Sequence, residues 1–263
     1  MIGLFLGSTD FPKIILAKLK KKKKKYFIID LTKNNIFKKD KNNYFISIGR
    51  FGQILNLIKK KKCKKVLFAG KIDRPKILDL KFDIKGIYYL SRIIKASKLG
   101  DAAILKELIK ILTENKVKLI KSNYFNPELT LKSGNFSITK PNKLELISIK
   151  KGIKSLNSLN AHNHVQGLII KNNTIIIKET SKGTKKMIQS INIFKKPGGI
   201  LIKFPKKKQD LRADLPTIGL DTLKDCKKAN LKGIVLKSNQ NIVIDKIKCI
   251  NFANKNKIFI KVI

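Results

Sequence analysis

The residues best suited to chemistry in this sequence are two aspartates and an arginine within five positions of one another. The stretch QDLRADLPTIG, Gln209 to Gly219, carries Asp210, Arg212 and Asp214 at alternate positions, in a chain with 17 acidic residues against 60 basic ones. In an extended backbone these side chains would project to one side, about 6–7 Å apart. That arrangement suits phosphate groups and a metal ion. The alternative is an Asp–Arg ion pair that stiffens a loop.

The residues that follow predict how the chain presents this stretch. Pro216 fixes its own φ and favours extended geometry at Leu215. Gly219 permits a turn into a helix that we expect near Asp221. The stretch would therefore be a loop between two regular elements.

A second candidate segment lies near the amino terminus. Gly7, Ser8 and Thr9 follow the apolar run Ile2 to Leu6, so they would form the first strand-to-helix turn. Open α/β sheets bind ligands at the carboxyl ends of their strands, and backbone N–H groups there can face a phosphate.

The order of the apolar runs predicts an α/β protein with two domains. Short β-rich runs, with helical spacing among them, open the chain at residues 2–6, 26–30, 44–48 and 66–69. They predict an N-terminal Rossmann-like open-sheet domain over residues 1–130. A polar stretch then leads into a second, mixed α/β domain over residues 131–263, in which Asn172 and Asn173 predict a hairpin turn. We expect the second domain to be catalytic, because it contains Gln209 to Gly219.

Two consecutive helices are predicted late in the first domain. Helical spacing covers Ile87 to Lys98 and Asp101 to Asn115. Gly100 would separate them, with Asp101 as the N-cap of the second helix.

Composition gives the chain a large positive charge. Its formal net charge is +43 and its pI is about 10.3, which is typical of proteins that bind nucleic acids or anionic surfaces. Few of the basic residues are Arg, although bidentate recognition of bases and phosphates favours Arg. The excess of Lys, Ile, Asn and Phe without Trp instead indicates AT-rich codon usage. We therefore expect no specific nucleic-acid partner.

Cysteines, histidines and apolar runs indicate the compartment. Cys63, Cys226 and Cys249 are widely separated, which predicts reduced thiols in a cytoplasmic protein. His162 and His164 alternate and are candidates for a metal pair, but no third ligand accompanies them, so we interpret at least one as a structural strand residue. We expect neither a signal peptide nor a transmembrane helix, because no apolar run approaches about 18 residues.

Six motifs in register resemble those of one enzyme family. QDLRADLPTIG is similar to the Gln-Glu-x-Arg-x-Asp-Leu-Pro-Thr-Ile-Gly signature of the UDP-2,3-diacylglucosamine pyrophosphatases of the I type, which act in lipid A biosynthesis. One short motif would be weak evidence, whereas six in order make the resemblance specific. The other five are GLFLGSTDFP (3–12), IGRFGQI (48–54), FAGKIDRP (68–75), LGDAAIL (99–105), and VQGLIIKNNTIIIKE with KGTKKM (165–187).

The resemblance implies an enzyme that hydrolyses UDP-2,3-diacylglucosamine to UMP and 2,3-diacylglucosamine 1-phosphate (lipid X), with Mg²⁺ or Mn²⁺ as cofactor. It implies that Asp214 ligates the metal or orients the attacking water, that Arg212 neutralises the diphosphate, and that Asp210 is a third catalytic residue. The implied substrate-binding residues are Gly7, Ser8, Thr9, Gly70, Arg74, Asp101, Gly183, Thr184 and Thr217.

The implied substrate also indicates where the protein works. Its acyl chains lie in a bilayer, so we expect peripheral binding to an anionic inner-membrane surface from the cytoplasm. A second copy of the chain, in a homodimer, is a further candidate partner.

Three positions depart from the family pattern. The N-terminal run of three glycines is reduced to Gly7, which lowers the tolerance for close approach of a phosphate. Lys182 and Lys185 stand where the family has Glu and Asp, so neither can ligate a metal in its charged form, although both can bind a pyrophosphate. Asp210 replaces a Glu.

Some residues and the charge also suggest three other functions. LGSTDF after the first strand also resembles the Gly-Thr-x-Asp-Phe motif of methionyl-tRNA formyltransferases, but no Ser-Leu-Leu-Pro loop follows it. A Rossmann oxidoreductase is disfavoured because GxGxxG is absent after residues 2–6. A basic nucleic-acid-binding protein would account for the charge but not for Gln209 to Gly219, and steep salt dependence of DNA binding would be its mark.

Overall fold

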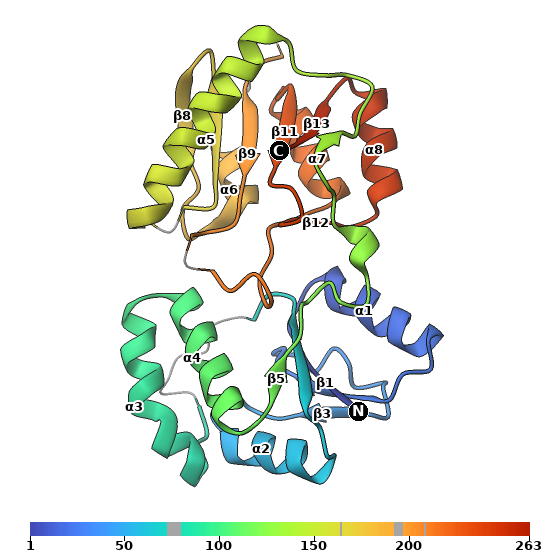
Figure 1. The fold of residues 1–263 in the computed structure, drawn as a ribbon, viewed down its shortest axis with the longest axis vertical. Helices are drawn as coiled ribbons and strands as arrows, with labels where there is room; N and C mark the ends of the chain where they lie inside the picture. Colours follow the sequence, from blue (N-terminus) through green and yellow to red (C-terminus); the bar gives the residue numbers. More distant parts are fainter. Residues whose placement is uncertain (73–79, 164, 192–196, 208) are drawn as a thin grey trace. The chain divides into compact units, whose positions relative to one another are not determined.

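The protein, studied as a computed structural model, divides into two compact units (Figure 1). The structure describes the whole chain except residues 73–79, 164, 192–196 and 208 and the side chains of residues 160–163. Unit 1 comprises Met1–Asn126 together with Asp210–Asp214, and unit 2 comprises Pro127–Gln209 together with Leu215–Ile263. Each unit is built of strands and helices, which confirms the predicted α/β fold class.

Unit 1 is built on a five-stranded sheet in which all pairs are parallel. Its strands, in sheet order, are β3 (Asn43–Phe45), β2 (Tyr26–Asp30), β1 (Ile2–Leu6), β4 (Lys65–Ala69) and β5 (Lys118–Leu119). The strands at its centre are nearly continuous apolar runs, as expected when both faces of a sheet are covered. The order reverses between β1 and β4, so these neighbours form the topological switch point, where open α/β sheets bind ligands.

Helices cover both faces of this sheet. They are α1 (Asp10–Lys21), α2 (Phe51–Lys60), α3 (Ile84–Lys98) and α4 (Asp101–Glu114). α2 and α4 pack on one face, in a core that includes the stacked rings of Phe5 and Phe68. Leu4 and Leu6 alternate with Phe5 and so point to the other face, where α1 buries Ile15 and Leu19.

The two predicted helices before β5 are confirmed, with changed ends. α3 begins at Ile84 because Asp83 caps it, accepting a hydrogen bond from the Gly86 N–H at 2.7 Å. The predicted N-cap of α4 is wrong: Gly100 occupies that position with φ +98, and Asp101 is the first helical residue. Glycine adopts this backbone without a steric penalty, and an acid in the first turn still complements the helix dipole.

Unit 2 is built on a six-stranded mixed sheet. Its strands, in sheet order, are β6 (Gly134–Asn135), β13 (Phe259–Val262), β11 (Gly233–Leu236), β9 (Ile200–Lys203), β7 (Gly167–Lys171) and β8 (Thr174–Lys178). β13, β11 and β9 are parallel, and the outer pairs are antiparallel. Asn172 and Asn173, both at positive φ, form the predicted hairpin turn between β7 and β8, as a two-residue hairpin loop requires.

Helices also cover both faces of the second sheet. α6 (Gly183–Gln189), α7 (Leu220–Lys228) and α8 (Lys246–Lys255) contribute to a core on one face. α5 (Lys143–Asn163) packs on the other face through Ile149 and Leu156. A short parallel pair, β10 (Thr217–Ile218) with β12 (Ile242–Val243), and a 3₁₀ turn at Pro127–Leu129 complete the unit.

Candidate active site

The stretch around Asp210 folds as a helical turn rather than as an extended segment. The carbonyl oxygen of Asp210 accepts hydrogen bonds from the N–H groups of Ala213 and Asp214, both at 3.0 Å. Asp210 Oδ1 also accepts from the Arg212 N–H at 2.9 Å. The predicted extended geometry, with three side chains on one side, is therefore wrong. The cause is local, because an Asp side chain can close a turn on the backbone two residues further on.

Asp210 and Arg212 form the ion pair that was the alternative interpretation of this stretch. Arg212 Nε donates to Asp210 Oδ1 at 3.0 Å, and Arg212 Nη2 donates to Oδ2 at 2.7 Å. These bonds hold the pKa of Asp210 below its ordinary value and raise the pKa of Arg212. Both carboxylate oxygens of Asp210 are thus occupied, whereas Asp214 is exposed. Of the two acids, Asp214 is the one presented to solvent.

The turn Asp210–Asp214 packs with unit 1, although it comes from the C-terminal half of the sequence. The Ser122 N–H donates to the carbonyl oxygen of Arg212 at 2.6 Å, and Ala213 packs against the core that α2 and α4 form with the sheet. Ser122 follows β5, so the turn is attached at the carboxyl edge of the parallel sheet.

The glycine turns after β1 and β4 meet at the same edge. Ser8 and Lys71 exchange backbone hydrogen bonds of 2.7 and 2.9 Å. A Cβ on Gly7 would lie 2.2 Å from the Lys71 carbonyl oxygen, and one on Gly70 would lie 2.6 Å from Pro12. Both positions therefore require glycine. Because β1, β4 and β5 are neighbours, these turns and Asp210–Asp214 share one edge of unit 1. The two turns flank the switch point, and Asp210–Asp214 is attached beside it, after β5.

Thr9 stands at the end of the first turn with a backbone that glycine normally occupies. Its φ is 153° and its ψ is 177°, directly before α1. This region is essentially restricted to glycine, and the family pattern has a run of glycines here. Thr9 therefore has a backbone conformation that glycine would adopt without a steric penalty.

The acid at the end of β2 has a structural role. Dinucleotide-binding folds use an acid at this place for the ribose. Here Asp30 is fully buried, and its oxygens accept from the N–H and hydroxyl of Thr32 and from the Phe37 N–H at 2.6 to 3.0 Å. Those contacts hold the loop after β2, so both oxygens of Asp30 are used within the protein and not for a ribose. This agrees with the absence of a GxGxxG motif from the sequence.

In unit 2, Thr184 lies in a chain of buried polar contacts. Its Oγ1 donates to Glu179 Oε1 at 2.8 Å and accepts from Lys203 Nζ at 2.7 Å. Lys203 Nζ also donates to the carbonyl oxygen of Thr217 at 3.4 Å. Lys203 is the last residue of β9 and only 8% exposed, and lysine is almost never buried without partners.

Sequence reasoning missed Lys203. A single lysine carries no signal in a chain with 60 basic residues. The available hint was its place at the end of the apolar run Ile200–Lys203, at the carboxyl end of a parallel strand.

Two buried polar atoms near the same edge of unit 2 have no hydrogen-bond partner among the described residues. They are Glu179 Oε2 and Gln209 Nε2. The other polar atom of each side chain has a partner. Gln209 Oε1 accepts from the Lys206 N–H at 2.8 Å, and Glu179 Oε1 accepts from the Thr184 hydroxyl. Unpartnered buried groups are rare in native proteins and call for an explanation such as a ligand or an ordered water.

The remaining predicted residues are placed as follows. Gly183 begins α6 with φ +83, and the Thr217 hydroxyl donates to the Leu215 carbonyl oxygen at 3.0 Å. Arg74, His164 and the side chain of His162 lie outside the described residues. The backbone of His162 belongs to α5, so the extended stretch predicted there is wrong for this residue. The structure therefore groups the predicted residues into two sets. Unit 1 holds Gly7, Ser8, Thr9, Gly70, Asp101, Asp210, Arg212 and Asp214, and unit 2 holds Gly183, Thr184 and Thr217.

The donor set suits a magnesium ion that is bound jointly with a substrate. No three His, Cys, Asp or Glu side chains of the described residues gather as a ready-made metal site. Mg²⁺ usually takes one or two protein carboxylates together with substrate phosphates and waters. Asp214, the exposed acid of this turn, would supply one such carboxylate.

Cys63, Cys226 and Cys249 are buried and free of disulfides, as predicted.

Family models match the sequence one after the other. The model of the LpxI N-terminal domain matches residues 1–129, and that of the LpxI C-terminal domain matches residues 132–261. The sequence is also 26% identical over 223 residues to the UDP-2,3-diacylglucosamine pyrophosphatase LpxI of Caulobacter vibrioides. That alignment covers 82% of this chain and 80% of the relative.

Proposed function

Because this chain belongs to the LpxI family in both of its domains, we propose that it hydrolyses the pyrophosphate bond of UDP-2,3-diacylglucosamine in lipid A biosynthesis. The products are UMP and 2,3-diacylglucosamine 1-phosphate. The observation that carries this proposal is the match of both family domains, in order, over nearly the whole sequence. The name of the relative from Caulobacter vibrioides supports the substrate.

The geometry of unit 1 supports a division of roles in this reaction. Asp214, exposed at the carboxyl edge of the sheet, orients the attacking water or ligates a metal ion. Arg212 is fixed by its two bonds to Asp210 and has further N–H groups with which to bind a diphosphate oxygen. Asp210 thus acts through Arg212 and not on the phosphate itself. A magnesium ion held by Asp214 and the diphosphate would neutralise charge on the phosphoryl oxygens.

Mass spectrometry of the purified Asp214→Ala protein tests the substrate. We expect it to retain UDP-2,3-diacylglucosamine, whereas the unaltered protein converts detergent-dispersed substrate to UMP and the sugar 1-phosphate. The unaltered protein should also lose activity in excess EDTA and regain it with Mg²⁺ or Mn²⁺. Absence of UMP release would contradict the proposed hydrolysis. Full turnover in EDTA would contradict only the proposed dependence on a metal ion.

The charge of the protein supports peripheral binding to an anionic membrane on the cytoplasmic side. Across the described residues, no helix combines the length and the apolar content needed to span a bilayer. The net charge is +43, and each lysine near anionic headgroups contributes up to about 1 kcal/mol. Salt screens this attraction, so sedimentation with anionic vesicles should fall between low salt and about 0.5 M NaCl. Sedimentation that does not change with salt would contradict an electrostatic contribution.

A further inference from the structure

The outer face of α3 exposes apolar side chains that the core of unit 1 does not use. The helix buries only Gly86 and Ala96. Ile84 is 88% exposed, Ile87 62% and Tyr88 73%, which is the i, i+3, i+4 spacing of one helix side. Further along are Ile94, and Leu99 at 70%. We call these five residues, Ile84, Ile87, Tyr88, Ile94 and Leu99, the α3 outer face.

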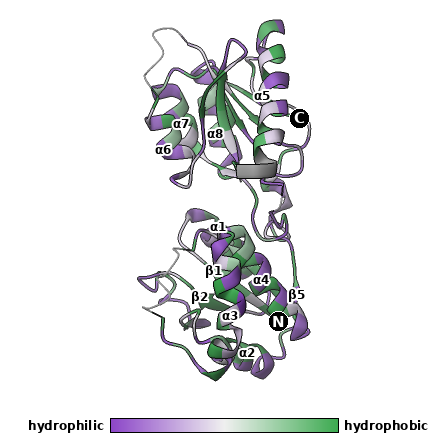
Figure 2. Ribbon diagram, turned by 90° about the vertical axis from the view of Figure 1, so that its left-hand side faces the viewer, coloured by the Kyte–Doolittle hydropathy of each residue, from purple (hydrophilic) through white to green (hydrophobic). Residues whose placement is uncertain are grey.

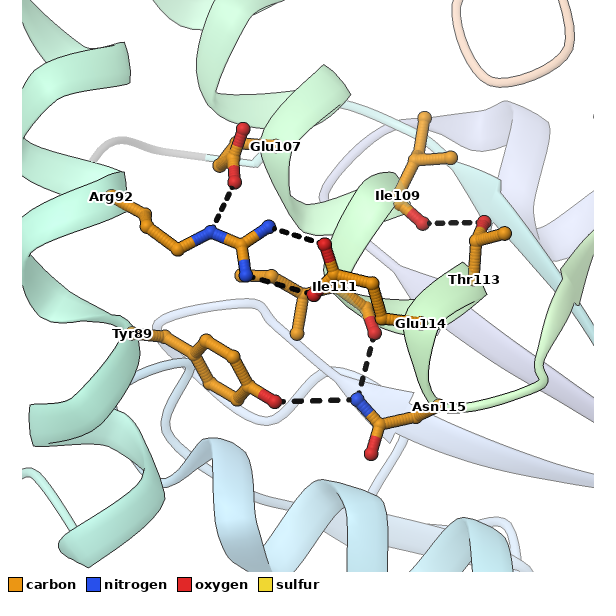
Figure 3. A network of polar contacts seen from close by, with 8 residues as sticks. All are labelled: Tyr89, Arg92, Glu107, Ile109, Ile111, Thr113, Glu114 and Asn115. Atoms are coloured by element: carbon orange, nitrogen blue, oxygen red, sulfur yellow. Dashed lines mark hydrogen bonds and ion pairs between the residues drawn. The ribbon is translucent and has the colours of Figure 1, made fainter.

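The side of α3 that carries Tyr89 and Arg92, next to this face, is fixed to α4, as Figure 3 shows. Arg92 Nε donates to Glu107 Oε1 at 2.6 Å, and the two terminal nitrogens of Arg92 donate to the Glu114 carboxylate at 2.8 and 2.9 Å. The Asn115 amide reaches the Tyr89 hydroxyl at 3.4 Å. Rotation of the outer face into the core would break these bonds. Exposure of that face therefore follows from how the helix is anchored.

The charged residues on this side of α3 are all basic. Lys85, Lys95 and Lys98 are exposed among the apolar residues, and α3 contains no acid. Figure 2 views the side on which α3 lies in Figure 1, and hydrophobic and hydrophilic residues alternate along its ribbon. The carboxylate of Asp83, before the helix, accepts from the N–H groups of Gly52, Gln53 and Gly86, so it is turned to backbone donors.

We propose that α3 is the membrane-docking helix of this protein. The α3 outer face inserts into the boundary between headgroups and acyl chains of an anionic phospholipid bilayer, and Lys85, Lys95 and Lys98 lie among the lipid phosphates. Apolar residues flanked by lysines are what a helix needs to bind in the plane of such a surface. The inference rests on the proposed function, in which the substrate keeps its acyl chains in the bilayer.

A second copy of the chain fits this face less well. A two-fold contact brings the same patch of both copies together. The lysines of one α3 would then face those of the other, and like charges in contact disfavour association. An anionic lipid surface complements the same lysines.

The absence of tryptophan from the chain allows a direct test. In full-length Tyr88→Trp protein, emission should shift to the blue when vesicles of phosphatidylcholine with about 30% phosphatidylglycerol are added, and brominated lipid should quench it. Tyr124→Trp is the matched control, because Tyr124 is 60% exposed in unit 1 beside Lys62, Lys64 and Lys65. The emission maximum of Tyr124→Trp should not shift when the vesicles are added. Equal shifts in both variants, or none in Tyr88→Trp while the protein sediments with the vesicles, would overturn the proposal.

Paired substitutions test the energetics independently. Ile84→Gln with Ile87→Gln should lower the vesicle partition coefficient roughly tenfold or more, because two apolar side chains lose their burial. Leu144→Gln with Ile147→Gln, at exposed positions of α5, should leave it unchanged. If the α3 double variant and the α5 double variant have equal partition coefficients, the result would contradict insertion of α3.

The outcomes separate docking from catalysis and from self-association. The vesicles contain no substrate, and hydrolysis is measured separately in detergent. A protein that binds vesicles through α3 but does not hydrolyse the substrate would contradict the proposed function and would still support membrane docking by α3. A blue shift of Tyr88→Trp that grows with protein concentration in the absence of vesicles would instead assign the face to a second copy and overturn membrane docking.

Discussion

At the scale of residues, the two aspartates of QDLRADLPTIG differ in what they contact. Arg212 occupies both carboxylate oxygens of Asp210, whereas Asp214 is exposed at the edge of the sheet. Spacing alone made the two acids equivalent. We therefore propose Asp214, the more exposed of the two, as the acid for the substrate, and Asp210 as a positioning residue for Arg212.

Asp214→Asn should lower kcat by about 10²–10⁴-fold, the usual effect of losing a group that assists proton or phosphoryl transfer. Its thermal midpoint should stay unchanged, because the side chain is exposed. Asp210→Asn should raise KM more than it lowers kcat, because it loosens Arg212. Steady-state kinetics and thermal melts of the two variants check this. If the thermal midpoint of Asp214→Asn falls together with its kcat, the result would favour a structural role for Asp214.

Lys203 carries a second expectation at this scale. Lys203→Met keeps the length of the side chain and replaces a buried cation by a buried apolar chain. It removes the donor to Thr184 Oγ1 and to the Thr217 carbonyl. We expect the unfolding free energy to fall by about 1–3 kcal/mol, because buried acceptors lose their donor. We also expect kcat, measured well below the melting transition, to fall about 10–100-fold, the loss typical of residues that orient a site. Lys178→Met, at the exposed end of β8, is the matched control. Equal activity of both variants would leave Lys203 no role in the reaction.

At the scale of elements, one carboxylate joins the amino ends of two helices. Asp83 accepts from the Gly52 and Gln53 N–H groups at the start of α2 and from the Gly86 N–H of α3. A Cβ on Gly86 would lie 1.9 Å from the Gly49 carbonyl oxygen. The lack of a side chain at Gly86 therefore lets the starts of α2 and α3 approach each other. The Asp83 carboxylate accepts from N–H groups that have no partner inside a helix.

The pH dependence of stability follows from the same contacts. Partial burial acts to raise the pKa of Asp83, but the hydrogen bonds from Gly86, Gly52 and Gln53 outweigh it, so the pKa lies below its ordinary value. Because the pKa of Asp83 is lower in the folded protein than in the unfolded chain, its ionised carboxylate stabilises the folded state. This stabilisation is fully present above the unfolded pKa of about 3.9, and it is lost as the pH falls from there through the folded pKa.

Asp83→Asn should therefore cost about 1 kcal/mol or more of unfolding free energy at neutral pH, because the amide nitrogen cannot accept the N–H bonds of the oxygen that it replaces. The difference from the unaltered protein should shrink below about pH 4. Urea titrations of both proteins at several pH values measure it. A difference that stays constant down to pH 3 would show that the charge of Asp83 does not matter.

At the scale of the whole molecule, the chain leaves unit 2 after Gln209, contributes Asp210–Asp214 to unit 1 and returns at Leu215. The most specific motif of the sequence is thus divided between the units. Residues 127–209 and 215–263 form a core of their own around the six-stranded sheet. The stability of unit 1 should therefore depend on a residue far from it in sequence.

Hydrogen exchange can measure this dependence. Ala213→Asp places a charge against the core of α2 and α4 and should lower protection in residues 1–126 by about 1–2 kcal/mol, with residues 127–209 unaffected. Ala229→Asp, a buried alanine of unit 2, is the converse control and should lower protection only in unit 2. Loss of protection in unit 2 for Ala213→Asp would contradict the assignment of this turn to unit 1.

Taken alone, the sequence determined the fold class, the hairpin after Lys171 and the family. These depend on patterns that are local or ordered along the chain: the period of apolar residues, two asparagines at a turn, and short motifs in register. Helix ends were less certain. Asp101 was predicted as a cap, yet Gly100 took that place, because the backbone requirement of the position outweighs the preference for an acid side chain.

Only the tertiary structure decided which residues form the candidate site. The bond from the Ser122 N–H to the Arg212 carbonyl attaches the signature turn to unit 1, and the bond from Lys203 to Thr184 creates a buried polar chain in unit 2. Each joins residues that are distant in sequence or lie on different elements. Local spacing carries no record of such contacts, because they depend on how whole elements pack, and that packing also leaves the α3 outer face exposed.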